Sequence, residues 1–184
     1  MNPHFIFNCL NSIQSFIMQN NKQDAMDYLS SFAQLIRLNL NASVEQEISL
    51  YNEIQILENY ITLERLRFQN SFEYTITVDS ALDQMDTEIP PMLIQPIVEN
   101  AIVHGMSSLN EGGIIDIRFD KHENGLAITV GDNGTNTRKS QSLHKSLGMD
   151  ITQRRLSHTN RPLSRPIQTK RVDGWTVVSM VVKV

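Results

Sequence analysis

The sequence has one cysteine, Cys9, and no glycine in its first 104 residues. A single thiol excludes an internal disulfide and a cysteine-rich zinc site, and it is typical of a reducing compartment. All eight glycines lie at or after Gly105. Because glycine weakens helices and is frequent in turns, this distribution predicts a helical first part followed by a glycine-punctuated α/β part.

Long apolar runs and an excess of positive charge are also missing. No segment approaches the roughly 18 consecutive apolar residues that a membrane-spanning helix needs. The 16 Lys and Arg against 20 Asp and Glu give a net charge of −4, which argues against a nucleic-acid-binding surface. With 184 residues, 40% of them hydrophobic and 20% charged, the composition is that of a soluble globular chain with one generous domain or two small ones.

Two helices with a short polar connection are predicted at the N-terminal end. Their apolar residues recur at three- and four-residue spacing, and Asn20 and Asn21 separate them. The expected inward residues are Ile6, Cys9, Leu10, Ile13, Phe16 and Ile17, then Ala25, Met26, Leu29, Phe32, Ala33 and Ile36. Such a hairpin has too little core to stand alone. Either two copies form a four-helix bundle, or the hairpin packs on the rest of its own chain.

A histidine begins this hairpin. His4 and Asn8 fall on the polar face of the first helix, so His4 is expected to be exposed. An exposed neutral imidazole can act as a nucleophile towards phosphorus near pH 7. The plainer interpretation is a solvated surface histidine.

A third helix and five strands are predicted from the remaining periodicity. The helix covers 49–68, with Leu50, Ile54, Leu57, Ile61 and Leu66 inward and with Glu53, Glu58, Glu64, Arg65 and Arg67 outward or at its ends. Alternating residues predict strands over 72–79, 113–121, 125–131, 167–172 and 175–184. The boundary between the helical and the α/β part is placed near residue 70.

A short helix over 93–105 is predicted between the first two strands. Pro96 falls near its first turn, where a missing N–H costs least, and Gly105 ends it. Its polar stripe comprises Gln95, Glu99, Asn100 and His104. The amide oxygen of Asn100 suits Mg²⁺, which usually keeps water and phosphate oxygens as its other ligands. An ordinary amphipathic helix presents the same kind of stripe to water.

Asp132, Asn133 and Gly134 follow the third predicted strand. A carboxylate there can accept a hydrogen bond from an exocyclic amine such as adenine N6, and Gly134 lets the backbone approach a ligand, although Asp-Asn-Gly is also a common turn. The polar residues 135–145 predict a loop suited to a lid. Gly148 then precedes a helix whose start suits phosphate oxygens.

These stretches together resemble the LytS-type sensor histidine kinases, which pair a His-containing dimerisation region with a Bergerat-type ATP-binding domain. The matching motifs are Asn-Pro-His-Phe-Ile-Phe-Asn at 2–8, Tyr-Ile-Thr-Leu-Glu-Arg-Leu-Arg-Phe at 60–68, Pro-Met-Leu-Ile-Gln-Pro-Ile-Val-Glu-Asn-Ala at 91–101 with His-Gly at 104–105, and Asp-Asn-Gly at 132–134. The resemblance implies an α+β fold. A helical dimerisation and phosphoacceptor region over 1–70, truncated at its N-terminus, is expected before an ATP-binding Bergerat-type α/β sandwich over 71–184, in which helices cover one face of a mixed sheet.

The resemblance also implies the site and the reaction. His4 matches the phosphate-accepting histidine, and the residues expected at ATP and magnesium are Glu99, Asn100 (the Mg²⁺ ligand), His104, Asp132, Gly134, Gly148 and Thr176. The γ-phosphoryl of ATP would pass to His4 and then to an aspartate of a response regulator, in this family often one with a LytTR-type DNA-binding domain. The full-length protein is expected to be a homodimer. This chain is expected to be the cytoplasmic region of a bacterial inner-membrane protein, attached to the membrane only through missing upstream segments.

Several residues depart from the family pattern. Val103 stands where relatives often carry a lysine, Asn136 and Ser146 where glycines are common, and Asp150 where an asparagine is expected. They leave open a dimerising scaffold or pseudokinase with the same fold. An anti-sigma-type serine kinase is a further alternative, but it leaves the motif at 2–11 unexplained.

Two further positions bear on the chemistry. Pro96 occupies the position at which related gyrase-type ATPases carry a water-activating glutamate, so simple ATP hydrolysis is disfavoured. Phe5 follows His4 where many histidine kinases place an acidic residue, and the group that accepts the histidine proton stays open.

Overall fold

The computed structural model describes residues 3–69, 71–106, 109, 111–134 and 163–184. Its helices are α1 (Pro3–Met18), α2 (Lys22–Ser43), α3 (Leu50–Arg67), α4 (Gln95–Asn100) and the π-helix η1 (Ala101–Gly105). Its strands are β1 (Ile48–Ser49), β2 (Phe72–Val78), β3 (Glu88–Ile89), β4 (Gly113–His122), β5 (Gly125–Asp132), β6 (Leu163–Val172) and β7 (Trp175–Val182). Within these ranges no helix is long and apolar enough to cross a membrane.

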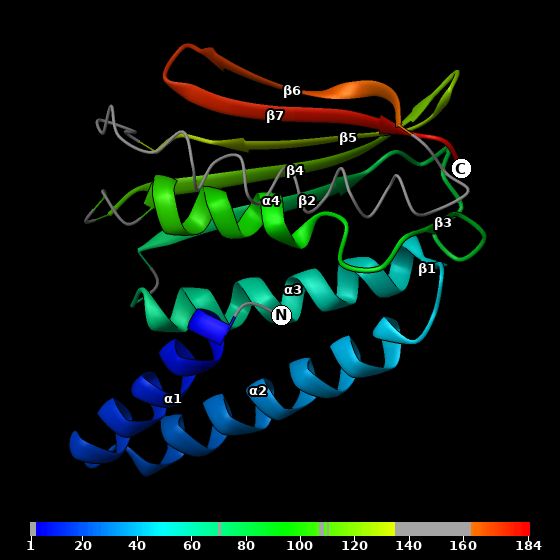
Figure 1. Cartoon of the computed structure of the whole chain (residues 1–184). Coiled ribbons are helices and arrows are strands. Elements are labelled where there is room, and N and C mark those ends of the chain that lie inside the picture. Colours follow the sequence, from blue (N-terminus) through cyan, green and yellow to red (C-terminus); the bar gives the residue numbers. More distant parts are fainter. Residues whose placement is uncertain (1–2, 70, 107–108, 110, 135–162) are drawn as a thin grey trace.

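The first two helices form the predicted hairpin (Figure 1). Asn20 takes the left-handed conformation at the turn, with a φ of 59°. The side chain of Asn21 accepts a hydrogen bond from the backbone N–H of Asp24 at 3.3 Å, and Ser49 caps α3 in the same way. Polar caps of this kind satisfy N–H groups that a helix start leaves without partners, so α2 and α3 begin where they do.

The large sheet has the strand order β2-β4-β5-β7-β6 (Figure 1). β2 and β4 are parallel and the other neighbours are antiparallel, so the sheet is mixed. Ile115, Ile117 and Phe119 of β4 are fully buried, whereas Ile114 and Arg118, which alternate with them, are exposed. Because alternate residues of a strand face opposite sides, the helices cover one face of the sheet, as predicted.

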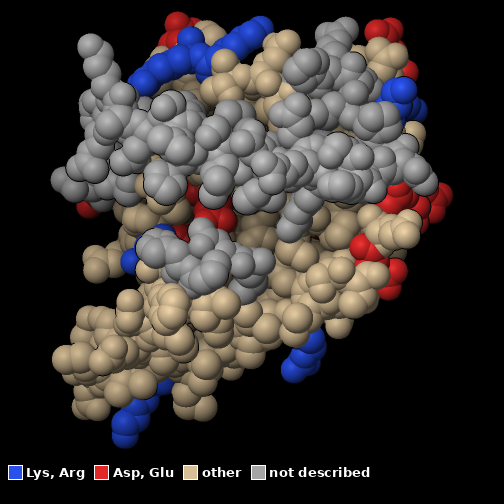
Figure 2. Space-filling model, viewed as in Figure 1, with Lys and Arg blue, Asp and Glu red and all other residues tan. Residues whose placement is uncertain are grey.

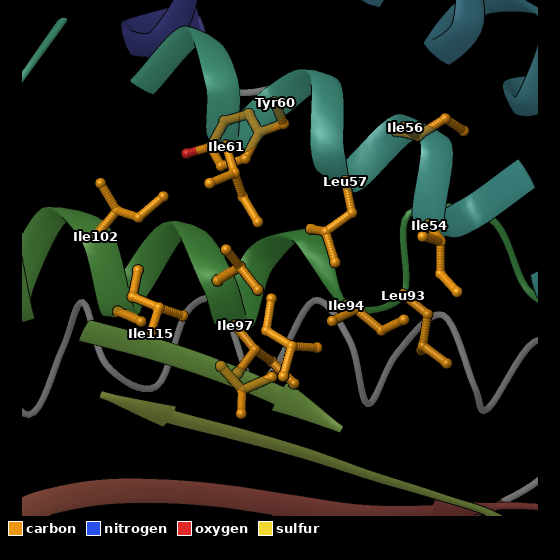
Figure 3. Packing of buried hydrophobic residues seen from close by; sticks show 14 of the residues in the cluster. Ile54, Ile56, Leu57, Tyr60, Ile61, Leu93, Ile94, Ile97, Ile102 and Ile115 are labelled. Carbon is orange, nitrogen blue, oxygen red and sulfur yellow. The ribbon is translucent and has the colours of Figure 1, made fainter. Parts of the chain in front are cut away.

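α3 lies between the hairpin and α4, and α4 lies between α3 and the sheet (Figures 1 and 3). Leu57 and Ile61 of α3 point towards Ile97 and Ile102 on the α4–η1 side, and Ile115 of β4 lies beyond them (Figure 3). All five side chains are at most 3% exposed. One hydrophobic cluster therefore extends from the hairpin through α3 and α4 to the sheet.

Burial on two sides makes parts of the predicted α3 pattern wrong. Glu53 and Glu64, expected outward or at the helix ends, are each 1% exposed, and Leu66, expected inward, is 37% exposed. A helix enclosed by two layers has buried positions around most of its circumference. A search for one apolar stripe therefore assigns its charged residues to water.

The hairpin faces a different direction from the one its periodicity predicts. Phe5 and Tyr28 are buried, whereas four residues expected inward are at least half exposed, namely Leu10, Ile17, Met26 and Leu29. The hairpin has apolar side chains on more than one face, and α3 covers only one of them. An exposed apolar surface is left along both helices.

A two-stranded sheet that was not predicted joins the start of α3 to the segment before α4. β1 and β3 are antiparallel, with Ile48 opposite Ile89 and Ser49 opposite Glu88. Each strand has two residues, too few to show a period. This small sheet brings the first turn of α3 beside the residues that lead into α4.

Candidate functional site

The helix that carries Asn100 has two conformations in sequence. α4 is α-helical up to Asn100, with Pro96 in its first turn as predicted, and η1 continues it as a π-helix to Gly105. Glu99, Asn100 and His104 are half-buried, whereas Gln95, predicted on the same polar stripe, is only 7% exposed. π-Helical turns are rare and are frequently found at functional sites.

The end of η1 packs directly against the turn after β5. A Cβ built on Gly105 would lie 2.6 Å from Oδ1 of Asp132, and a Cβ on Gly134 would overlap the Cα of Gly105. Both glycines are therefore needed for the close approach of two backbones. The His-Gly and Asp-Asn-Gly motifs, about 30 residues apart in the chain, form one cluster.

Asp132 is held in a defined orientation at the end of β5. Its side chain is 7% exposed, and Oδ1 accepts a hydrogen bond from the backbone N–H of Gly134 at 3.1 Å. The side chain of Asn133 accepts from the backbone N–H of Ile114 at 2.7 Å and donates to the carbonyl of Gly112 at 3.0 Å. These bonds fix the turn to the start of β4, which directs the carboxylate of Asp132 towards Gly105.

Thr176 lies beside this carboxylate in the sheet. Asp132 of β5 and Thr176 of β7 are directly opposite each other in the antiparallel pair, and Thr176 is 6% exposed. Opposite residues on neighbouring strands have side chains on the same face. The two residues expected near the adenine are thus neighbours.

Tyr60 of α3 packs against the first turn of α1. The ring centroid of Phe5 is 5.1 Å from that of Tyr60. Burial raises the pKa of Tyr60 well above its usual range, and the charges of Glu64 and Glu99 add to this shift. His4 lies in the same first turn as Phe5, but its side chain is outside the described residues, so its exposure stays a prediction.

Buried polar groups that the sequence did not reveal lie within the hairpin and on α3. Tyr28 donates a hydrogen bond to Sγ of Cys9 at 3.5 Å, and burial raises the pKa of Cys9 to about 11. Glu64 accepts a bond from Nε of Arg67 at 3.0 Å. The Cys9 thiol therefore stays protonated at neutral pH and belongs to the core.

The sequence did not predict that two acidic residues of α3 are buried and hydrogen-bonded. The carboxylate of Glu53 accepts hydrogen bonds from the backbone N–H groups of Met92 and Ile94, whereas that of Glu64 pairs with Arg67. Their spacing along the helix resembles that of solvated glutamates. The burial of Glu53 follows from its contact with the segment around Met92, and that contact is visible only in the tertiary structure.

Some predicted elements lie outside the described residues. These are the loop over 135–145, the helix with Gly148, and the departures Asn136, Ser146 and Asp150. Val103 is described and is half-buried within η1.

Asn100 is the described residue that was expected to hold magnesium. In the part of the chain that the structure describes, no group of three or more His, Cys, Asp or Glu side chains could hold an ion. Asn100 offers one amide oxygen from a half-buried position. This donor set fits Mg²⁺, which is commonly held by one or two protein groups together with phosphates and water.

Sequence comparisons relate the chain to bacterial sensor kinases. A family model described as histidine kinase matches residues 1–72. The sensor protein LytS of Oceanobacillus iheyensis is 36% identical over 134 residues, 73% of this chain but 22% of the relative. The sensor histidine kinase BtsS of Escherichia coli is 34% identical over 158 residues, 85% of this chain and 27% of the relative. The chain thus spans about a quarter or less of the length of these two relatives.

One relative that is more similar in length and two solved structures also match the chain. The Bacillus subtilis protein YwpD is 30% identical over 189 residues, covering 98% of this chain and 66% of the relative. The histidine kinase domain of the blue-light activated kinase of Erythrobacter litoralis EL346 superposes with a TM-score of 0.56 at 14% identity, over 91% of this chain and 83% of that domain. The kinase ThkA, in complex with the response regulator TrrA, gives 0.51 at 15% identity, over 98% of this chain and 59% of that one. At these identities the structural similarity concerns the fold.

Proposed function

The chain belongs to the LytS-type sensor histidine kinases, and from this membership we propose that it transfers the γ-phosphoryl group of ATP to His4 and then to an aspartate of a response regulator. The observation that carries the proposal is the cluster of Asp132, Gly105 and Thr176. It joins the end of the Asn100 helix to two strand ends. We assign residues 1–70 to dimerisation and phosphate acceptance, and residues 71–184 to ATP binding.

The adenine end of the nucleotide is assigned to Asp132 and Thr176. Asp132 accepts a hydrogen bond from the backbone N–H of Gly134, and its carboxylate can also accept one from the exocyclic amine of adenine. Thr176 supplies a hydroxyl on the same face of the sheet. Gly134 and Gly105 let the backbone come close, and Gly148 is assigned to the phosphates.

The phosphate end is assigned to the half-buried polar stripe of α4 and η1. Asn100 would hold Mg²⁺, and Glu99 and His104 lie on either side of it along the helix. When bound, the ion would neutralise charge on the transferring phosphoryl group. Catalysis of this reaction consists mainly of positioning and charge stabilisation.

The transfer step needs an imidazole nitrogen and a good leaving group. A nitrogen of His4 forms a bond to the γ-phosphorus, the bond from that phosphorus to the β–γ bridging oxygen breaks, and ADP leaves. The imidazole gives up its proton. Pro96, one turn before Asn100, has no ionisable group with which to activate water, so transfer to histidine is favoured over hydrolysis.

A response regulator is the proposed second partner. The histidine kinase ThkA has been solved with the response regulator TrrA, and its chain has the same fold as this one. We extend this to an aspartate acceptor, in a regulator with a LytTR-type DNA-binding domain. The kinase itself is not assigned any contact with nucleic acid.

A homodimer is proposed from the exposed surface of the hairpin. Phe7 and Ile17 of α1 are 65% and 63% exposed, and Met26 and Leu29 of α2 are 65% and 50% exposed. In the view of Figure 2, few charged side chains lie on the surface of the hairpin. Two hairpins can bury these residues as a four-helix bundle. Light scattering of the full-length protein should give twice the chain mass, and a monomer there would contradict the dimer.

The location of the chain is a further proposal. We place it on the cytoplasmic side of a bacterial inner membrane, joined to that membrane through segments upstream of residue 1. The LytS relative is several times longer than this chain, which leaves room for a sensor. Fractionation of the full-length protein tests the placement.

A dimerising scaffold without phosphoryl transfer is the second candidate. Its support is Val103 in η1, at a position where relatives often carry a lysine. Calorimetry of ATP binding, with and without Mg²⁺, separates the two functions. A kinase should bind with a dissociation constant below roughly 1 mM, about −4 kcal/mol, and Asp132→Ala should abolish binding. No binding by the parent chain would favour the scaffold.

A further inference from the structure

Glu53 is a buried carboxylate with two backbone partners from another element. It lies in the first turn of α3 and is 1% exposed. Oε2 accepts a hydrogen bond from the N–H of Met92 at 2.7 Å, and Oε1 accepts one from the N–H of Ile94 at 3.2 Å. A buried charge is tolerated only where its oxygens are hydrogen-bonded. Both oxygens of this carboxylate are used.

The two partners are backbone groups that need an acceptor. Met92 has a φ of 54°, in the left-handed region that a residue with a side chain rarely adopts. Ile94 is the N-cap of α4, and its own side chain makes no capping hydrogen bond. The first N–H groups of a helix have no partners within it. Glu53 therefore caps α4 from α3.

This cap fixes one end of the helix that carries Asn100. The other end is fixed where Gly105 packs on Asp132. Asn100 lies between them, six residues after Ile94 and about 9 Å farther along the axis. If the start of α4 shifts, Asn100 moves relative to Asp132.

α3 also contacts the histidine helix. Tyr60, seven residues after Glu53, packs against Phe5 in the first turn of α1. One helix therefore holds both the start of α4 and the start of α1. The β1–β3 pair keeps the segment before α4 beside Glu53.

We propose that Glu53 is a positioning residue: it caps α4 from α3 and so sets the place of Asn100 relative to Asp132 and to the first turn of α1. This deepens the proposed function and depends on it for the role of Asn100. A carboxylate is required because both N–H groups point at acceptor oxygens. An amide would present one donor to one of them.

The test compares Glu53→Gln with Glu58→Gln. Glu58 is half-buried on the same helix and accepts from the side chain of Gln55, so it is a matched control. Two quantities are measured: the hydrogen exchange of the Met92 and Ile94 amides without nucleotide, and the Mg²⁺ concentration at half-maximal ATP binding. In Glu53→Gln at least one of the two amides should exchange at least about tenfold faster, and the Mg²⁺ midpoint should rise at least about fivefold. Glu58→Gln should match the parent in both.

A purely structural role is distinguishable from positioning. If Glu53→Gln melts cooperatively but keeps the parent's Mg²⁺ midpoint, positioning of Asn100 is overturned. Unchanged exchange at Met92 and Ile94 would overturn the cap itself. If the parent shows no Mg²⁺-dependent binding, the proposed function fails, and the exchange comparison still decides the cap.

Met92→Gly keeps the test decisive if Glu53→Gln does not fold. Glycine adopts a positive φ without strain, so with glycine at residue 92 the segment before α4 depends less on the hydrogen bond to Glu53. The double variant that combines Glu53→Gln with Met92→Gly should fold, and its Mg²⁺ midpoint should be higher than that of Met92→Gly alone. Equal midpoints in these two variants would overturn the proposal.

Discussion

The backbone of Gly105 lies against the carboxylate of Asp132, so close that a Cβ at residue 105 would lie 2.6 Å from Oδ1. The contact joins the helix that carries Asn100 to the strand that ends at Asp132. It is also the point at which two motifs of the sequence become one site.

Gly105→Ala should separate these two elements. The added methyl group collides with the Asp132 carboxylate, which must move or force η1 away, at a cost of about 1 to 3 kcal/mol. We expect ATP affinity to fall at least about tenfold by calorimetry. Gly131→Ala is the control, since its methyl group would meet the Trp175 ring at an ordinary 3.4 Å. Equal affinity in the two variants would contradict the assignment.

His4→Gln should abolish acid-labile, alkali-stable labelling of the chain by [γ-³²P]ATP. Glutamine keeps a polar side chain at the start of α1 but has no nucleophilic nitrogen. Affinity for ATP should stay within about twofold of the parent. Labelling that survives in His4→Gln would remove His4 as the acceptor.

Asn100→Ala should remove the magnesium dependence of ATP binding. The substitution deletes one amide oxygen from a half-buried position and leaves Asp132 and Thr176 in place. Weak, metal-independent binding is therefore expected in titrations with and without Mg²⁺. A midpoint for Mg²⁺ equal to that of the parent would assign the ion to other residues.

Ile61→Ala should destabilise the chain by about 2 to 5 kcal/mol, because its fully buried side chain fills the space between α3 and α4. Leu66→Ala, on the same helix but 37% exposed, should cost about 1 kcal/mol or less. Urea unfolding followed by circular dichroism measures both. Similar costs would mean that α3 is not enclosed between two layers.

Alkaline pH should destabilise the chain through Cys9. Burial raises the pKa of this thiol from 9.0 to about 11, so between these values the unfolded chain loses the proton while the folded chain keeps it. Stability from this group is complete below pH 9 and is lost as the pH rises through 11, on the order of 2 to 3 kcal/mol. The free energy of unfolding of Cys9→Ala, measured by urea titration, should depend less on pH in this window. An equal dependence on pH in variant and parent would contradict the raised pKa of Cys9.

The strand periodicities predicted the sheet well, because one face of each strand is buried and the other is more exposed to solvent. Phe72–Val78 and Gly125–Asp132 lie close to where alternation places them, and Asp132 ends its strand as expected. Helix ends were also predictable at Asn21 and Ser49, where the capping side chain is local. The roles of His4 and Gly148 stay predictions.

Helix faces were less predictable. Glu53 is buried because backbone N–H groups from residues 92 and 94 meet it, and no short-range pattern encodes a partner that far along the chain. Met26 and Leu29 were expected in the hairpin seam and are exposed instead. Periodicity shows that a helix has an apolar face but not which neighbour covers it.

The sequence by itself determined the family and most of the elements, and it predicted which residues carry the chemistry, because motifs, caps and periods are local and can be read along the chain. Only the tertiary structure decided that Gly105 touches Asp132, that Thr176 lies opposite Asp132, and that Glu53 caps α4. These relationships depend on close packing between segments distant in sequence. Such contacts form only when the whole core closes.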